Sequence, residues 1–244
     1  MKKRVIIVGA TSGIGLELTQ LFVKEGSIVG IAGRREEKLN QIKQTAPDQI
    51  VTEVIDVTTE NATEGLDRLI TKLGRVDIYF HSSGIGFQNF RLKPEVELST
   101  IRTNVEGFGR MATHMFNFFS KQGDGHLAVI SSIAGTKGLG VAPAYSATKR
   151  FQSIYIDALE QLAYLKKINI TFSDIRPGFI ATPLLDDGGN YPMLMNPQKV
   201  AHEIYQKLLK RRRVITVDWR YRLLVFFWRL IPRWLWKRLP IKMK

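Results

Sequence analysis

The sequence predicts an α/β fold, with one doubly wound parallel sheet of about seven strands and helices on both of its faces. Short apolar runs rich in β-branched residues recur along the chain, as expected for buried parallel strands. Segments with helical spacing separate these runs, and glycine or polar residues follow most of them. Strands that alternate with helices specify a parallel sheet with right-handed crossovers.

Length and composition are those of a single globular domain. The 244 residues can bury an independent core, and 44% hydrophobic and 24% charged residues are ordinary values. The chain has no cysteine, which excludes disulfides and thiol nucleophiles and fits a reducing, cytoplasmic location. The basic start MKKR turns glycine-rich before any apolar core or cleavage site, so we expect no signal peptide.

The expected elements place most chemistry-bearing residues at one edge of the sheet. We expect strands at residues 4–9, 28–32, 50–56, 77–83, 125–132, 168–176 and 213–217. The expected helices cover about residues 16–26, 36–44, 59–73, 95–119 and 144–166. Ligands of such sheets bind beyond the carboxyl ends of the strands. The residues found there are Gly9–Gly15, Arg34, Asp56, Ser82–Gly86, Ser132 and Pro177–Gly178.

A glycine-rich turn joins the first strand to the first helix. It reads Gly9-Ala10-Thr11-Ser12-Gly13-Ile14-Gly15, with the spacing G-x-x-x-G-x-G. Glycines let the backbone approach a phosphate at the helix N-terminus, where free N–H groups and the helix dipole favour an anion. The spacing differs from the common dinucleotide fingerprint, and such a turn also forms without a ligand.

The end of the second strand carries two arginines. In this fold an acid at that position binds the ribose hydroxyls of NAD, whereas an arginine accommodates the 2′-phosphate of NADP. Gly33 stands where the acid would be, and Arg34 and Arg35 follow it. A solvated basic loop is the alternative. Given a nucleotide site, the sequence favours NADP(H) over NAD(H).

Tyr145 and Lys149 lie in the segment SSIAGTKGLGVAPAYSATK, residues 131–149. Residues four apart share a helix face, so the ammonium of Lys149 is expected beneath the phenol of Tyr145. A neighbouring positive charge lowers the pKa of a phenol, which can then exchange a proton with a carbonyl or alcohol oxygen. The pair alone also fits an ordinary helix surface, so its assignment depends on the other motifs.

Together these motifs resemble the short-chain dehydrogenase/reductase family over about residues 3–217. The family's TGxxxGxG turn is matched with Val8 in place of threonine, and its PGxxxT segment is matched by residues 177–182. Asn104, Ser132, Tyr145 and Lys149 match the family's catalytic tetrad. The resemblance implies a single-domain Rossmann fold over residues 1–217, followed by a basic aromatic extension over residues 218–244.

The resemblance also implies a set of cofactor-binding residues. They come from the glycine-rich turn, the ends of the following strands, the active-site helix and the segment that borders the nicotinamide. They are Gly9, Thr11, Ser12, Gly13, Ile14, Gly15, Arg34, Arg35, Asp56, Val57, Ser83, Gly84, Tyr145, Lys149, Pro177, Gly178, Ile180 and Thr182.

The tetrad residues take distinct roles in the mechanism that the resemblance implies. Ser132 polarises the substrate carbonyl by a hydrogen bond. Tyr145 donates the proton in reduction and accepts it in oxidation. Lys149 lowers the pKa of the phenol and holds the nicotinamide ribose, while Asn104 anchors a water that resupplies the proton. Ser131 is expected to face away, because neighbours on a strand point in opposite directions.

One segment departs from the family pattern. Where the family commonly has Asn-Asn-Ala-Gly, this chain has His81-Ser82-Ser83-Gly84, which bears on stability or cofactor affinity more than on chemistry. We expect His81 to be a hydrogen-bonded substitute for asparagine rather than a catalytic group. The four scattered histidines form no metal-ligand pattern, so no metal is expected.

The substrate itself is not named by the sequence. In the family, a substrate loop occupies the segment that matches residues 184–197. Here Tyr191, Met193, Leu194 and Met195 suggest an apolar lid, and methionines suit an adaptable pocket. The same residues could equally be ordinary packing residues.

The tail concentrates the positive charge of the chain. The net charge is +14, and residues 210–244 hold 12 Lys/Arg and one acid, Asp218. All four tryptophans lie there too, and the apolar run at residues 223–228 is far below the ~20 residues needed to span a bilayer. The pattern is typical of an amphipathic helix on an anionic membrane surface, of packing on the body or a second subunit, or, least of all, of nucleic-acid binding.

The sequence therefore predicts an NADP(H)-dependent oxidoreductase that interconverts a ketone and a secondary alcohol on a hydrophobic substrate, with a lipid-like ketone as the hypothesis. The alternative is a membrane-associated protein with this fold that binds or scaffolds without turnover. The resemblance implies a homodimer or homotetramer, because the helix bearing Tyr145 is the usual dimer face of the family. The predicted location is cytoplasmic, peripheral at the inner face of a membrane.

Overall fold

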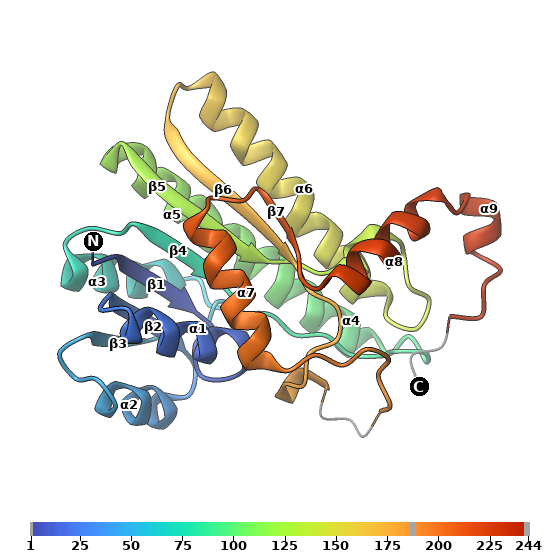
Figure 1. Ribbon diagram of the computed structural model, residues 1–244, viewed down its shortest axis with the longest axis horizontal. Helices are drawn as coiled ribbons and strands as arrows, with labels where there is room; N and C mark the ends of the chain where they lie inside the picture. Colours follow the sequence, from blue (N-terminus) through green and yellow to red (C-terminus); the bar gives the residue numbers. More distant parts are fainter. Residues whose placement is uncertain (1, 186–188, 242–244) are drawn as a thin grey trace.

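The computed structural model describes residues 2–185 and 189–241 of the chain. Within them, seven parallel strands form one sheet in the order β3-β2-β1-β4-β5-β6-β7, between two layers of helices (Figure 1). The predicted fold class is confirmed. The strand order reverses between β1 and β4, which is where ligands of such sheets bind.

The strands overlap the predicted ones and are buried most completely at the centre of the sheet. Every residue of β4 is buried, as is all of β1 beyond its first residue. The strands are β1 (Arg4–Val8), β2 (Ile28–Gly33), β3 (Ile50–Val54), β4 (Ile78–His81), β5 (Asp124–Ile130), β6 (Asn169–Arg176) and β7 (Val214–Thr216).

The helices cover both faces of the sheet and continue into the tail. They are α1 (Gly13–Lys24), α2 (Glu36–Gln44), α3 (Ala62–Leu73), α4 (Pro94–Ile101), α5 (Phe108–Gln122), α6 (Pro143–Leu165), α7 (Pro197–Leu209), α8 (Trp219–Leu230) and α9 (Arg233–Trp236). Three short segments complete them: the π-helix η1 (Arg102–Gly107) and the 3₁₀ turns η2 (Ile133–Thr136) and η3 (Pro183–Leu185). Within the described residues, every helix is too short or too polar to span a lipid bilayer.

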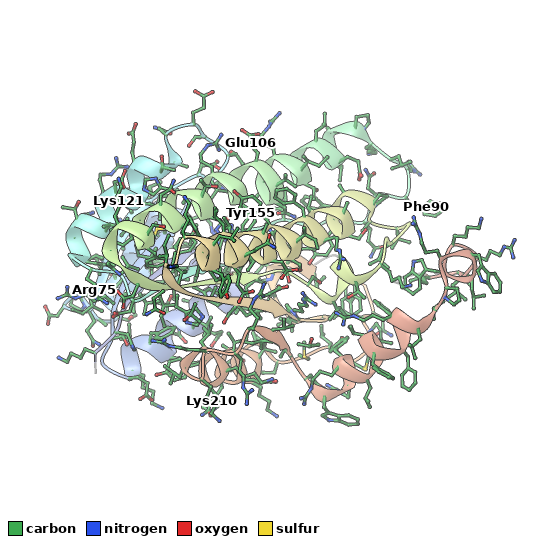
Figure 2. All side chains as sticks on the ribbon, turned by 90° about the horizontal axis from the view of Figure 1, so that it is seen from above. Arg75, Phe90, Glu106, Lys121, Tyr155 and Lys210 are labelled. Carbon is green, nitrogen blue, oxygen red and sulfur yellow. The ribbon has the colours of Figure 1, made fainter. Side chains whose placement is uncertain are left out.

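Two apolar clusters fix the layers. One joins α1, α2, α7 and α8 to the sheet, and the other joins α3, α5 and α6 to the opposite face. Figure 2 shows this arrangement from above, with Glu106 and Tyr155 on one side of the sheet and Lys210, just after α7, on the other. The carboxyl edge of the strands is therefore open between two helical layers.

The helix predicted at residues 95–119 is interrupted. A π-helical turn, η1, separates α4 from α5, and Asn104 lies within it. Gly107, the last residue of this turn, packs against the segment that follows β3. A Cβ on Gly107 would lie 2.7 Å from the carbonyl oxygen of Val57. Wide turns of this kind are frequent at functional sites, and here the turn carries Asn104 toward the carboxyl edge of the sheet.

Helix α7 was not predicted, although its start carries an ordinary signal. The side chain of Asn196 accepts a hydrogen bond from the Lys199 N–H at 3.1 Å, and Pro197 occupies the first helical position. Its apolar residues follow at helical spacing and are buried: Val200, Ala201, Ile204 and Leu208.

The first helix of the tail is packed into the body. Tyr221 is fully buried, and Val225 lies beside it in the same apolar cluster. The Tyr221 ring occupies the space over Gly178, where a Cβ would lie 2.2 Å from the ring. Its hydroxyl accepts a hydrogen bond from the Phe179 N–H at 3.1 Å and lies 3.0 Å from the carbonyl oxygen of Pro192. Residues 218–225 therefore stabilise the loop at the end of β6.

Truncating Tyr221 should destabilise the whole protein. We expect Tyr221→Ala to lower the free energy of unfolding by about 3–5 kcal/mol, because it leaves a cavity in the core. Phe226→Ala, on the exposed side of the same helix, should change it by less than about 0.5 kcal/mol. Urea denaturation measures both, and equal stability of the two variants would show that the tail is only an appendage.

Candidate active site

A cleft of about 970 Å³ opens at the carboxyl edge of the sheet. One end is formed by the turn after β1, and the other by the loops after β4 and β6 together with α8. Most residues of the predicted site line it: Gly9, Thr11, Ser12, Gly13, Ile14, Arg34, Arg35, Asp56, Val57, Ser83, Gly84, Tyr145, Lys149, Pro177, Gly178, Ile180 and Thr182. Gly15, Asn104 and Ser132 are buried next to the cleft without lining it.

The glycine-rich turn is shaped by close backbone contacts. Gly9 has a φ of 87°, and a Cβ there would lie 2.6 Å from the backbone nitrogen of Ser83. A Cβ on Gly15 would lie 2.3 Å from the carbonyl oxygen of Gly9. Gly13 begins α1 with a φ of 57° and faces Thr182. The backbone leaves no room for a side chain at Gly9 and Gly15, and the positive φ at Gly13 favours glycine. The turn exposes the N-terminus of α1 to the cleft.

The two arginines after β2 occupy different places. Arg35 donates hydrogen bonds to the hydroxyls of Thr11 and, at 2.9 Å, Ser12, so it braces the glycine-rich turn. Arg34 is largely exposed, and its guanidinium lies 3.9 Å from the carboxylate of Asp56. Burial raises the pKa of Asp56, but hydrogen bonds from Thr58 and the charge of Arg34 outweigh it, and the pKa lies below its ordinary value.

Lys149 is a buried cation at the centre of the cleft. Its ammonium donates hydrogen bonds to the carbonyl oxygen of Ile130 at 2.9 Å and to Oε1 of Gln152 at 3.0 Å. Burial lowers its pKa to about 8, and the carboxylate of Asp174 opposes this shift. Asp174 is itself fully buried and is paired with Arg176. A lysine so placed loses its proton at a much lower pH than an exposed lysine does.

The phenol of Tyr145 lies beside Lys149, as the spacing predicted. The ammonium of Lys149 is 5.8 Å from the centre of the Tyr145 ring. The expected lowering of the pKa of Tyr145 by Lys149 is wrong in this structure, because burial raises that pKa and only a hydrogen bond with Ser132 lowers it. Gly86 leaves room for the ring, since a Cβ there would lie 2.4 Å from it. The phenol therefore retains its proton at neutral pH.

The two serines after β5 point in opposite directions, as predicted. The Ser131 hydroxyl donates a hydrogen bond to the buried carboxylate of Asp174. The Ser132 hydroxyl accepts a hydrogen bond from the Ala134 N–H at 3.1 Å and reaches Tyr145. Of the two hydroxyls, only that of Ser132 is placed beside the phenol.

Asn104 is held rigidly, and the residue that connects it to Lys149 was missed by the sequence analysis. The Asn104 side chain accepts a hydrogen bond from the Ile85 N–H at 2.9 Å and donates to the Ile85 carbonyl at 2.7 Å. Gln152 donates to the Asn104 carbonyl oxygen at 3.0 Å while accepting from Lys149. Its position three residues after Lys149 on the same helix face was the available signal.

His81 is a core residue at the end of β4. Its Nδ1 lies 2.8 Å from the hydroxyl of Tyr79, and the side chain is fully buried. Burial and the nearby charge of Lys149 lower the pKa of His81 to about 3, so the ring is neutral. No part of His81 lines the cleft, which agrees with the non-catalytic interpretation.

The far end of the cleft is mainly apolar. Its walls come from the loops after β4, β5 and β6 and from α8, and they include Phe87, Leu139, Leu184, Tyr191, Met193, Leu224 and Trp228. Of the predicted lid, Tyr191 and Met193 line the cleft, whereas Met195 is buried in the core and Leu194 is half exposed. Residues 186–188 of that loop lie outside the described residues.

No cluster of three or more His, Asp or Glu side chains suited to a metal ion occurs among the described residues. The groups gathered at the cleft are instead a phenol, a hydroxyl and an ammonium, beside a helix N-terminus. Such groups can exchange protons, polarise a carbonyl and bind phosphate.

The fold and the cleft at its carboxyl edge are those of a Rossmann-type α/β protein. Residues 3–190 match the family model described as short chain dehydrogenase, and the chain belongs to this family. The family consists of oxidoreductases, in agreement with the predicted class of activity.

Relatives and solved structures extend this comparison. The chain is 31% identical over 210 residues to an uncharacterized oxidoreductase of Staphylococcus haemolyticus, covering 83% of this chain and 89% of that protein. It is 28% identical over 239 residues to dehydrogenase/reductase SDR family member 7B of Xenopus tropicalis, covering 87% and 76%.

Two similar solved structures contain bound NADP. ElxO with NADP bound superposes with a TM-score of 0.77 at 25% identity, covering 89% of this chain and 98% of that one. The closed form of serine dehydrogenase complexed with NADP⁺ gives 0.79 at 25% identity, covering 88% and 93%.

Replacing Gln152 should destabilise the protein while Lys149 is charged. We expect Gln152→Leu to lower the free energy of unfolding at neutral pH by about 1–3 kcal/mol, because Lys149 loses an acceptor and Asn104 a donor. Above pH 8, where folded Lys149 is neutral, the difference from wild type should shrink. Urea denaturation across this pH range is the measurement.

Gln161→Leu, on the exposed side of the same helix, is the matched control. A stability loss for Gln152→Leu that is constant with pH would contradict a role in holding the ammonium of Lys149.

Proposed function

We propose that the protein is an NADPH-dependent oxidoreductase that interconverts a ketone and a secondary alcohol on a hydrophobic substrate. One observation carries this proposal: the Tyr145 phenol, with Ser132 and Lys149 beside it, stands between a glycine-rich turn and an apolar chamber in a single cleft. A nucleotide and an apolar substrate bound at the two ends would meet at the phenol.

The residues present fit a dinucleotide. The turn at Gly9–Gly15 leaves the space that a Cβ would fill and presents the N-terminus of α1, where a pyrophosphate would bind. Arg34, exposed beside Asp56, would bind a 2′-phosphate, and Arg35 supports the turn. When bound, the nicotinamide cofactor supplies or accepts the hydride.

The chain's own residues would manage the proton and the carbonyl oxygen. Ser132 would donate a hydrogen bond to the carbonyl oxygen as negative charge develops on it. Tyr145, whose burial raises its pKa and keeps the phenol protonated, would deliver the proton in the reductive direction. Lys149 would hold the ribose hydroxyls, and Asn104 would support a proton-resupplying water.

The apolar walls of the chamber favour a lipid-like ketone as substrate. Tyr191, Met193, Leu224 and Trp228 surround the end of the cleft away from the nucleotide site. Burying an apolar chain against such walls contributes about 25 cal/mol per Å². The alternative is a binding or scaffold protein that keeps the fold without turnover.

Cofactor preference should depend on Arg34. We expect the protein to bind NADPH more tightly than NADH, and Arg34→Ala to weaken NADPH binding at least about tenfold while leaving NADH binding almost unchanged, because a charged hydrogen bond is lost. Calorimetric titration measures both, and Lys38→Ala, an exposed cation on α2, is the control. Equal loss for both cofactors would contradict a 2′-phosphate contact.

Turnover should depend on the phenol of Tyr145. We expect Tyr145→Phe to lower kcat by about 10²-fold or more while NADPH binding persists, because the acid is removed and the fold is kept. Tyr164→Phe, exposed on the same helix, should have no effect. The assay is NADPH oxidation with long-chain ketones; full activity of Tyr145→Phe would contradict the mechanism, and absence of turnover in the wild type with every ketone would favour the scaffold.

We also propose a homodimer or homotetramer that uses the outer face of α6. This face exposes Phe151, Ile154, Tyr164 and Leu165, and apolar groups of this size are usually covered. The likeness to the family supports the same face.

The outward face of the tail supports peripheral association with a membrane. The side chains that α8 points away from the body are large, apolar and at least half exposed: Trp219, Leu223, Phe226, Phe227 and Leu230. Amphipathic helices with basic flanks insert such faces into the headgroup region of anionic bilayers. The proposed location is the cytoplasmic surface of a membrane.

Removing this face should release the protein from vesicles. We expect Phe226→Ser with Leu230→Ser to lower binding to phosphatidylglycerol-containing vesicles at least about tenfold, because apolar area no longer inserts. Leu98→Ser with Leu209→Ser, exposed residues outside the tail and outside the proposed α6 interface, is the control. Substitution is preferred to deletion because Tyr221 and Val225 belong to the core. Unchanged flotation of the tail variant would contradict membrane insertion.

A further inference from the structure

A second pocket, distinct from the cleft, lies where the tail meets the start of α6. Its volume is about 1080 Å³, and it is bounded by the loop at residues 135–140, the first turns of α6, and α8 and α9. Figure 1 shows α8 and α9 extending outward from one end of the molecule. Five cationic residues line the pocket: Lys137, Arg150, Arg176, Arg229 and Arg233.

Most of this positive charge is not neutralised by the protein. Arg176 is paired with the buried Asp174, and Asp157, the acid on the pocket wall, is paired with Arg213. Within residues 2–185 and 189–241, Arg150, Arg229 and Arg233 have no carboxylate partner. Three like charges facing one space repel each other, and an anion between them would remove that repulsion.

The pocket is held in place by contacts between the loop and the tail. The Lys137 ammonium donates a hydrogen bond to the Ile231 carbonyl oxygen at 2.6 Å and lies 5.6 Å from the Trp236 ring centre. The Trp236 indole donates to the Gly138 carbonyl at 2.8 Å. These contacts hold the loop at residues 135–140 against the tail. They use no arginine side chain, so the arginines of the pocket remain available to a ligand.

Helix α8 presents three faces, and the pocket lies on one of them. At 100° per residue, Tyr221, Leu224 and Trp228 point to the cleft, and the outward apolar face lies opposite. Arg229 falls on the flank between these two faces, where it lines the pocket. The cationic pocket is therefore bordered by the apolar surface that we propose inserts into the membrane.

We propose that this pocket binds the headgroup phosphate of an anionic phospholipid. Guanidinium groups bind phosphate oxygens in bidentate geometry, which suits Arg150, Arg229 and Arg233 around one phosphate. A lipid, rather than free phosphate, is the ligand because its acyl chains would lie against the neighbouring outward face of α8. The inference rests on the proposed membrane association and gives it a specific lipid contact.

The test compares two variants with equal loss of tail charge. Arg229→Gln with Arg233→Gln removes the pocket cations, and Arg222→Gln with Lys237→Gln removes two exposed cations elsewhere in the tail. Flotation of the full-length protein uses phosphatidylcholine vesicles that carry either phosphatidylglycerol or an equal charge of oleic acid. We expect the pocket variant to bind phosphatidylglycerol vesicles about tenfold more weakly than the control variant, and both to bind oleate vesicles alike.

Three results would overturn the proposal. Equal losses of the two variants on phosphatidylglycerol would show unspecific attraction. Calorimetric binding of glycerol 3-phosphate that the pocket variant abolishes, with vesicle binding unchanged, would assign the pocket to a soluble phosphate. Absence of wild-type binding to either vesicle would remove the lipid ligand, while NADPH oxidation by the same samples reports on the reductase separately.

Discussion

The buried ammonium of Lys149 is the interaction on which the arrangement of the site depends. An unpaired buried charge costs several kcal/mol, so it persists only when acceptors surround it. The Ile130 carbonyl at the end of β5 and the Gln152 amide on α6 supply these acceptors. The negative charge of Asp174 also favours the charged form of Lys149. The same Gln152 amide donates a hydrogen bond to the backbone carbonyl oxygen of Asn104. One cation thus holds β5, α6 and η1 in register around the phenol.

The tail closes the same cleft from the other side. Tyr221 packs on Gly178 and binds the backbone of the loop after β6, so the apolar end of the cleft and the predicted nicotinamide-bordering segment depend on residues beyond β7. The same helix turns an apolar face outward and a basic flank toward α6. The apolar wall of the cleft, the outward apolar face and the cationic pocket are then three sides of α8. Under the proposed membrane association, an apolar substrate would have a short path from the bilayer to the cleft.

Patterns of neighbouring residues predicted the features of the fold that depend on local interactions. The apolar runs gave all seven strands, and the turn from Gly9 to Gly15 and the spacing of Tyr145 and Lys149 indicated the edge at which the site lies. The sequence did not predict features that depend on contacts between distant segments. These are the hydrogen bond from Gln152 to Asn104, the π-helical turn η1 and the burial of Tyr221 in the core. The direction of the pKa shift at Tyr145 was also misjudged, because burial, which a sequence does not display, outweighs the neighbouring charge. The roles of the site residues remain proposals.

The most direct measurement is an NMR titration of Lys149 in the ligand-free protein. Lysine labelled with ¹³C at Cε reports the charge of each ammonium, and Lys149→Met assigns the signal. The account predicts that Lys149 titrates at a pKa of about 8, two units or more below the ordinary value of ~10.4 for a lysine side chain. A Lys149 signal that titrates with the exposed lysines would contradict the buried, acceptor-held ammonium from which the account of the site begins.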